Sequence, residues 1–410
     1  MILESSAQGQ AGWQQRHSIL AVLFSAYLLL YMDRMAIATA IPFIAKDFRL
    51  SPLAMGGVLS AFFVGYAAMQ LPGGILADRF GPRRVMTASI LGWSLFTLFT
   101  GMASGLSLLL GIRVLFGVTE GSFPPSASKT IAMWFPQDEV GRANGFQLAA
   151  VQLGAAAAPL CVSWVIAHWG WRAVFFSLLV PGLVLSFFVW IFVRDLSPPL
   201  KGSANVDRAA APVSVIATPA VVWCAVTIFF WSAAAWGLMN WLPTYLLQAR
   251  GFSLSKMGLL GSLPYLAGAV GYYLGGHFTD CYFSRARQIP ILAGLLLGGV
   301  STYLAAMAPS GEWAIAFLVM SFLFLFVSAG GIFTMPLVIV PAGAVGAAFG
   351  FINTAAQVAA FVSPLAVGYV LGVTHGDFMK VLFGFVGLFA MAAVAALKIR
   401  SPRDAGYAKQ

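Results

Sequence analysis

LSPLAMGGVLSAFF, residues 50–63, returns 202 residues later as FSLSKMGLLGSLPY, residues 252–265. Three residue types keep their places in the two copies: Ser51 and Ser253, Met55 and Met257, Gly56 and Gly258. The same offset aligns GGILADRFGPRR (73–84) with the first twelve residues of GGHFTDCYFSRAR (275–287). Because this offset is about half of the 410-residue chain, the sequence predicts two halves that derive from one duplicated unit.

The composition indicates that both halves lie in a lipid bilayer. The chain is 60% hydrophobic and 9% charged, and its mean hydropathy is +0.88. Long apolar segments that contain glycine are typical of membrane helices rather than of alternating barrel strands. We therefore predict an all-α integral membrane protein with twelve transmembrane helices in two pseudo-symmetric six-helix bundles. The predicted spans are 18–44, 54–77, 85–103, 106–135, 142–167, 172–193, 216–248, 256–279, 289–308, 312–335, 342–371 and 377–397.

One long polar segment separates the halves. The stretch DLSPPLKGSANVDRAAAPVSV (195–215) is rich in Pro, Gly and Ser, which is typical of a linker. The predicted domains are an N-terminal six-helix bundle (1–194), a cytoplasmic linker (195–215) and a C-terminal six-helix bundle (216–410).

The net charge of +10 indicates topology rather than a nucleic-acid partner. If both termini are cytoplasmic, the cytoplasmic loops and tails hold far more lysine and arginine than the outer loops do. This is the positive-inside bias of membrane proteins. The basic excess therefore predicts orientation, and nucleic acid is excluded as a partner.

GGILADRFGPRR closes the second predicted span. Its paired glycines permit close helix packing, and Asp78 can accept hydrogen bonds at the N-terminus of a neighbouring helix. A plain positive-inside loop would explain the arginines but neither Asp78 nor the glycines. The segment resembles the signature loop of the major facilitator superfamily, G-x-L-A-D-R-x-G-x-R-R. That resemblance implies the major facilitator fold and a gating role for Gly74, Asp78, Arg79, Gly81, Arg83 and Arg84, with Asp280 in the degraded second copy.

Four charged residues interrupt apolar spans of the N-terminal half. Asp33 and Arg34 lie within 18–44, and Arg113 and Glu120 lie within 106–135. A charge at bilayer depth costs roughly 3 kcal/mol even on lenient scales, so such residues face a protein interior or a water path. Arg113 and Glu120 share a helix face, about 10 Å apart along the axis. Two acids and two arginines predict a site that handles protons and anions.

Structural ion pairing is the alternative for these four residues. The candidate pairs are Asp33 with Arg34, or Asp33 with Arg113 together with Arg113 and Glu120. Apolar replacements would cost less if stability alone were selected, which favours a functional site.

Further segments resemble the anion:cation symporter family: YMDR in the first span, TEGSFPP followed by WFPQDEVGRA, and NWLPTYLLQARGFS in the seventh. The resemblance implies that Arg34 and Arg113 bind the substrate carboxylate and that Asp33 and Glu120 carry protons. It also implies a gating role for Glu139 and Arg142, although Val140 stands where the family has arginine. Other residues that it places in the substrate site are Tyr31, Tyr66, Gln152, Asn353 and Gln357.

Alternatives remain for several of these residues. Tyr31 and Tyr66 can serve ordinary packing, and Gln152 can form hydrogen bonds between helices. Gln357 departs from the family, which has Asn at that position, and this puts the substrate's hydroxyl pattern in doubt.

The predicted function is import of an organic anion, such as a sugar acid or another carboxylate, by proton symport through alternating access. No histidine pair has metal-ligand spacing and no P-loop occurs, so we expect no metal, no cofactor beyond coupling protons, and no enzyme activity. The expected partners are the anion and the lipid bilayer of a bacterial plasma membrane, with the protein working as a monomer. The alternatives are an antiporter or exporter of drugs or other solutes, although the fifth span lacks a Gly-Pro pair, and a solute sensor that does not transport.

Overall fold

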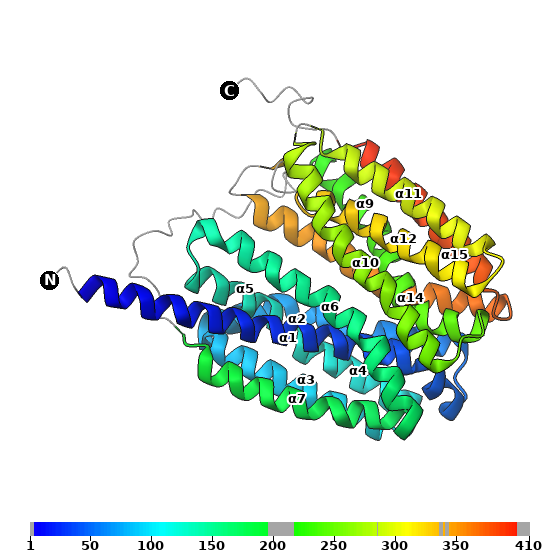
Figure 1. The fold of residues 1–410 in the computed structure, drawn as a ribbon, viewed down its shortest axis with the longest axis horizontal. Helices are drawn as coiled ribbons and strands as arrows, with labels where there is room; N and C mark the ends of the chain where they lie inside the picture. The colour runs from blue at the N-terminus through cyan, green and yellow to red at the C-terminus, as the bar shows by residue number, and fades with distance from the viewer. Residues whose placement is uncertain (1–3, 196–216, 285, 336–338, 341–343, 400–410) are drawn as a thin grey trace. The chain divides into compact units, whose positions relative to one another are not determined.

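The computed structural model describes residues 4–195, 217–284, 286–335, 339–340 and 344–399, and the regular secondary structure in these ranges is helical (Figure 1). The N-terminal half contains α1 (Glu4–Phe48), α2 (Pro52–Phe80), α3 (Pro82–Met102), α4 (Leu106–Gly121), α5 (Phe123–Trp134), α6 (Gln137–Trp169) and α7 (Trp171–Phe192). The C-terminal half contains α9 (Pro219–Thr244), the π-helical turn η1 (Tyr245–Ala249), α10 (Leu254–Cys281), α11 (Gln288–Met307), α12 (Gly311–Ile332), α14 (Val345–Val373) and α15 (Phe378–Leu397).

Within the described residues, 11 helical segments are long and apolar enough to cross a membrane. One of them, Leu106–Trp134, joins α4 and α5 across a break at Ser122. One more long helix, α10, has 28 residues and is not among these 11 segments. These twelve segments correspond to the twelve predicted spans.

The chain divides into two compact units. The N-terminal unit comprises Met1–Leu50 and Ala61–Ser197, and the C-terminal unit comprises Pro198–Gln410 together with Ser51–Ser60 at the start of α2. The predicted linker, 195–215, lies outside the described residues except for Asp195.

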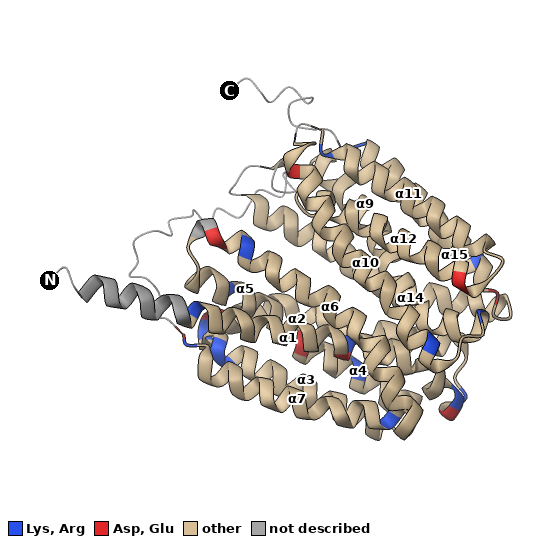
Figure 2. Ribbon diagram, in the orientation of Figure 1, with Lys and Arg blue, Asp and Glu red and all other residues tan. Residues whose placement is uncertain are grey.

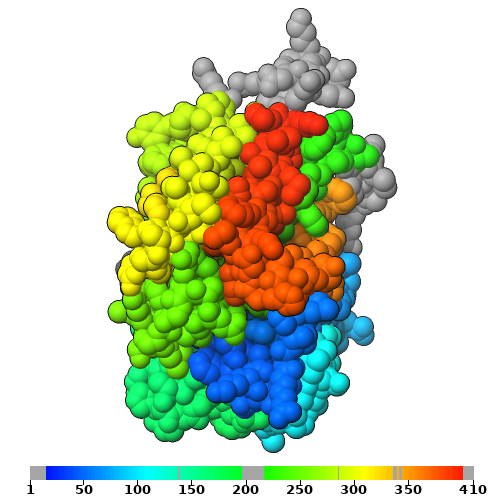
Figure 3. Space-filling model, turned by 90° about the vertical axis from the view of Figure 1, so that its right-hand side faces the viewer, coloured from blue at the N-terminus to red at the C-terminus, as the bar shows by residue number. Residues whose placement is uncertain are grey.

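The duplication read from the sequence is visible in the packing of each unit. In the N-terminal unit, α1 packs against α6 and α7, and α3 packs against α4 and α7. In the C-terminal unit, α9 packs against α14 and α15, and α11 packs against α12 and α15. Figure 3 shows the helices of the C-terminal unit on the surface, where α15 lies between α11 and the start of α9. Helices in matching positions of the two halves therefore make matching contacts.

Glycines bring α2 and α4 into close contact. A Cβ atom on Gly65 of α2 would lie 2.0 Å from the carbonyl oxygen of Val114, and one on Gly117 of α4 would lie 2.1 Å from that of Phe62. Real Cβ atoms do not approach backbone oxygens this closely, so the two helices touch only because both positions lack side chains.

We expect Gly117→Val to destabilise the N-terminal unit, because the added side chain forces α2 and α4 apart. Overpacking of this kind costs about 1–3 kcal/mol. The matched control is Gly111→Val on the same helix, where a Cβ atom meets nothing within 4 Å. Thermal unfolding of the two purified variants should show a lower midpoint for Gly117→Val only. Equal midpoints would mean that the close approach of α2 and α4 is not required.

Candidate functional site

The centre of the candidate site is a buried ion pair between α1 and α4. An amino group of the Arg34 guanidinium donates a hydrogen bond to Oε1 of Glu120. The Arg34 side chain is 4% exposed and that of Glu120 is fully buried. In Figure 2 most charges lie near helix ends, whereas one mixed group of acidic and basic residues lies at mid-length of the N-terminal helices. A charged pair at this depth is rare in membrane proteins and is typical of functional sites.

The local sequence explains where Glu120 lies. Helix α4 ends at Gly121, and α5 starts at Phe123 with Pro124 and Pro125, which have no backbone N–H to continue the α4 hydrogen bonds. Glu120 therefore lies in the last turn of α4, where the helix dipole disfavours a negative charge. Arg34 supplies the positive charge that stabilises the carboxylate in this position.

Aromatic rings surround the Arg34 guanidinium. Its carbon atom lies 4.7 Å from the ring centroid of Tyr31, 4.5 Å from that of Phe62 and 4.7 Å from that of Tyr66. Cation–π contacts at these distances are worth about 0.5–2 kcal/mol each, with the larger values in desolvated sites. The rings therefore hold the arginine in place independently of Glu120. Phe62 was not predicted as a site residue, because nothing in LSAFF distinguishes it from core phenylalanines.

Arg113 is buried without an acidic partner among the residues that the structure describes. Its guanidinium carbon lies 4.7 Å from the ring of Phe116 and 5.5 Å from that of Phe62. No carboxylate among the described residues forms an ion pair with it, and its Nε atom is buried without a hydrogen-bond partner. The Arg113–Glu120 pair that the sequence offered as an alternative is not formed. Two helical turns separate these residues along α4, whereas Arg34 reaches Glu120 from α1.

Asp33 also lies buried near these groups, with a side chain that is 3% exposed. Neither of its carboxylate oxygens has a hydrogen-bond partner in the described part of the chain, so the alternative pairing of Asp33 with Arg34 or Arg113 is not observed. Oε2 of Glu120 is likewise buried without a partner. Burial of an ionised carboxylate without partners is strongly unfavourable, and protonation relieves that cost.

Amide side chains supply further polar groups in the N-terminal unit. Gln152 of α6 is 5% exposed and its Oε1 atom has no partner among the described residues. Gln147, on the same helix, is 4% exposed and its Nε2 atom has none either. The sequence reasoning missed Gln147, which lies nearer the polar start of the helix. In the C-terminal unit, Asn353 and Gln357 lie half-buried one turn apart on α14, and Oε1 of Gln357 is buried without a described partner.

The signature loop forms a set of contacts at the end of α2. Lys129 of α5 donates from Nζ to Oδ1 of Asp78 at 2.8 Å and to the carbonyl oxygen of Ala77 at 2.9 Å. The acid at the N-terminus of α3 is Asp195, whose Oδ1 accepts from the backbone N–H of Arg83 at 3.0 Å. Gly81 adopts φ 85°, and a Cβ atom there would lie 2.4 Å from the Asp195 carboxylate. The role expected of Asp78 at a helix N-terminus is thus taken within this unit by Asp195, which composition alone assigned to the linker.

The other predicted gating residues lie at helix ends. Glu139 forms an ion pair with Arg16 of α1 at 3.3 Å, and Asp280 forms one with Arg287 at 3.3 Å. Among the remaining residues of this group, Arg79, Arg84 and Arg142 are exposed and Gly74 is half-buried. A Cβ atom added to Gly74 would lie 3.8 Å from Cβ of Pro125. Among the described residues, no three His, Cys, Asp or Glu side chains cluster in a way that could hold a metal ion.

Comparison with known proteins places the chain in a family. The family model of the Major Facilitator Superfamily matches residues 23–364, and the chain belongs to this superfamily of membrane transporters. The "Probable sulfoacetate transporter" of Cupriavidus necator is 32% identical over 94% of this chain and 94% of its own length. The "Probable galactarate/D-glucarate transporter" of Escherichia coli K12 is 30% identical over 96% of both chains, and the hexuronate transporter of Bacillus subtilis is 25% identical over 94% of both.

A solved structure supports the same fold. The inward-facing, unoccupied structure of a bacterial homologue of the human lysosomal transporter Spinster matches 94% of this chain and 95% of its own, with a TM-score of 0.78 and 21% identity. The predicted family and the twelve-helix membrane fold are confirmed. The chain is an integral membrane transporter and not an enzyme.

Proposed function

We propose that the protein is a secondary active transporter that imports an organic anion, of the sugar-acid class or another carboxylate, together with protons. The observation that carries this proposal is the buried Arg34–Glu120 pair, with Arg113 close by and unpaired by any described acid. Arginine presents a planar fork that matches a carboxylate and stays charged in a cavity. An anion can therefore bind Arg113 and compete with Glu120 for Arg34.

This competition couples the anion to a proton. When a substrate carboxylate takes over Arg34, Glu120 is left buried without its cation, an arrangement that costs about 3–5 kcal/mol. Protonation of Glu120 removes that cost, so anion binding and proton binding favour each other. Asp33, whose oxygens have no described partner, is the second proton carrier in the proposal.

The relatives support the substrate class. Their names specify sulfoacetate, galactarate and D-glucarate, and hexuronate, all of which are organic acids. We propose that Tyr31, Tyr66, Gln152, Asn353 and Gln357 bind the rest of such a substrate, because aromatic rings and amides suit the apolar faces and hydroxyls of sugar acids. Alternating access between two duplicated bundles is the expected transport mode.

The positive-inside bias supports an orientation with both termini in the cytoplasm, in the plasma membrane of a bacterium. The bacterial relatives that cover nearly the whole chain support the same location. We propose that the monomer is the working unit, because the Arg34–Glu120 site is built within one unit of one chain.

The test is uptake by purified protein in sealed proteoliposomes. A thermal-shift screen against D-glucarate, galactarate, hexuronates and sulfoacetate first selects the ligand. We expect the selected anion to accumulate when the outside is more acidic than the inside, and a protonophore to abolish accumulation. Binding without uptake would indicate a sensor, and accumulation driven by an opposite proton gradient would indicate an antiporter. Either result would overturn the proposal.

A further inference from the structure

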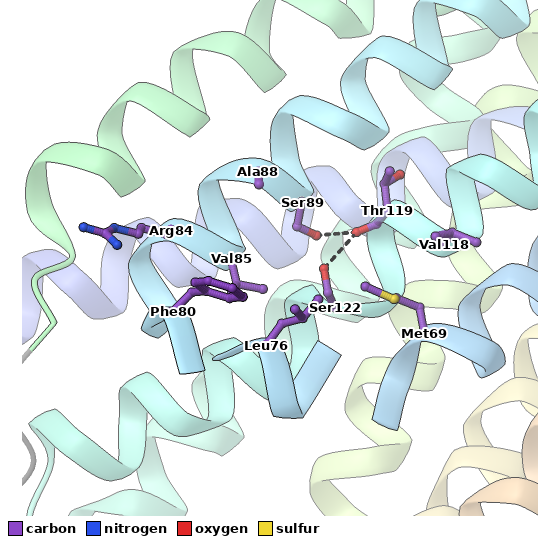
Figure 4. Close-up of a pocket in the computed structure, with 10 residues that line it drawn as sticks. All are labelled: Met69, Leu76, Phe80, Arg84, Val85, Ala88, Ser89, Val118, Thr119 and Ser122. Carbon is purple, nitrogen blue, oxygen red and sulfur yellow. Dashed lines mark hydrogen bonds between the residues drawn. The ribbon is translucent and has the colours of Figure 1, made fainter. Parts of the chain in front are cut away.

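A cavity of about 410 Å³ opens on the N-terminal unit between α2, α3 and the end of α4 (Figure 4). Its apolar lining comes from Leu76 and Phe80 of α2, Val85 and Ala88 of α3, and Val118 of α4. The volume lies within the range of small-ligand pockets. None of these five residues belongs to the proposed substrate site.

The few polar groups inside the cavity already have partners. The Ser89 hydroxyl donates to the carbonyl oxygen of Thr119 at 2.5 Å, and the Ser122 hydroxyl donates to the same oxygen at 3.2 Å. Figure 4 shows both bonds converging on Thr119, beside the break between α4 and α5. Because both hydroxyls already donate hydrogen bonds to a backbone oxygen, the interior of the cavity suits a hydrocarbon chain better than a polar solute.

Among the described residues that line this cavity, Arg84 is the only charged one. In Figure 4 it lies at one end, and its guanidinium points away from the Ser89–Thr119 hydrogen bond. It is exposed, and no acid among the described residues forms an ion pair with it. Neighbouring groups are otherwise engaged, since the Arg83 guanidinium lies 4.1 Å from the Trp190 ring centroid and Asp78 binds Lys129.

We propose that this cavity binds an anionic phospholipid, with one acyl chain between α2, α3 and α4 and the headgroup phosphate at Arg84. An apolar recess that ends in an uncompensated arginine at the turn between two membrane helices matches both parts of such a lipid. The proposal does not depend on the identity of the transported anion. A chain seated here contacts Thr119 and Ser122, which flank Glu120, so the lipid braces the helix break that carries the ion pair.

The test is native mass spectrometry of the full-length protein in detergent, titrated with palmitoyl-oleoyl phosphatidylglycerol or with the phosphatidylcholine of the same chains. We expect wild type to bind one phosphatidylglycerol more tightly than any phosphatidylcholine. Arg84→Gln should weaken that binding about fivefold, the effect of one basic residue at an anionic headgroup. Arg79→Gln is the matched control. Arg79 is exposed at the end of α2, close in sequence to Arg84, but it does not line the cavity.

A second variant tests the acyl-chain half of the proposal. Ala88→Phe fills the cavity while leaving Arg84 intact, and it should weaken phosphatidylglycerol binding at least as much as Arg84→Gln does. Thermal unfolding verifies that each variant is folded. If Ala88→Phe is not folded, the comparison of Arg84→Gln with Arg79→Gln alone tests the proposal. Equal losses for Arg84→Gln and Arg79→Gln would show diffuse surface attraction and overturn the proposal. Full displacement of the lipid by inorganic phosphate, with binding retained in Ala88→Phe, would indicate a simple anion site and overturn it as well.

Discussion

We expect replacement of Glu120 by Gln to abolish uphill uptake while anion exchange across the membrane continues. Gln keeps the volume of Glu and an oxygen that can accept from Arg34, so the pairing of α1 and α4 is retained. It has no proton to release, so anion binding is no longer linked to proton binding. The measurement is accumulation of labelled anion against its gradient, compared with exchange of the same anion between two equal pools.

The control for this variant is Glu312→Gln. Glu312 lies at the exposed start of α12, where it pairs with Lys256. This variant should retain both uphill uptake and exchange. If Glu120→Gln still concentrates the anion on a proton gradient, Glu120 is not the coupling acid, and Asp33 becomes the remaining buried carboxyl in the N-terminal unit to test.

The sequence predicted which charged side chains lie buried within the spans but not how they pair. A charge in a bilayer span is costly wherever it points, so composition alone marked Asp33, Arg34, Arg113 and Glu120. Which charges form an ion pair depends on how α1 crosses α4. That crossing is set by contacts between segments far apart in the sequence, so it cannot be predicted from either segment alone. Phe62 was missed for the same reason, because its role comes from its proximity to Arg34 and Arg113 rather than from its residue type.

The fold was likewise predictable from the sequence, whereas some boundaries of its helices and of the linker were not. The constant offset between the halves predicted the duplicated architecture, because a repeat is a property of the sequence itself. The span predicted at 106–135 is two helices, since the consecutive Pro124 and Pro125 prevent α4 from continuing past Gly121. Asp195 was assigned to a linker by composition, yet its side chain binds a backbone group 112 residues away.

We expect replacement of Arg113 by Gln to remove anion binding with little effect on folding. Arg113 has no ion pair among the described residues, so its removal breaks no ion pair that the structure shows. Loss of a buried, hydrogen-bonded charge partner for the anion costs about 2–5 kcal/mol, which is roughly a 30-fold to 4,000-fold loss of affinity. Thermal shift with the selected anion measures the affinity, and the midpoint without ligand measures the stability.

Arg34→Gln provides the contrast that makes this result interpretable. It also removes an anion-binding arginine, but it leaves Glu120 buried without its cation, and breaking a buried pair costs about 3–5 kcal/mol of stability. We therefore expect both variants to lose affinity and only Arg34→Gln to lose thermal stability. If Arg113→Gln keeps its affinity and instead unfolds as readily as Arg34→Gln, then Arg113 supports the packing of Phe62 and Phe116 and does not bind the anion.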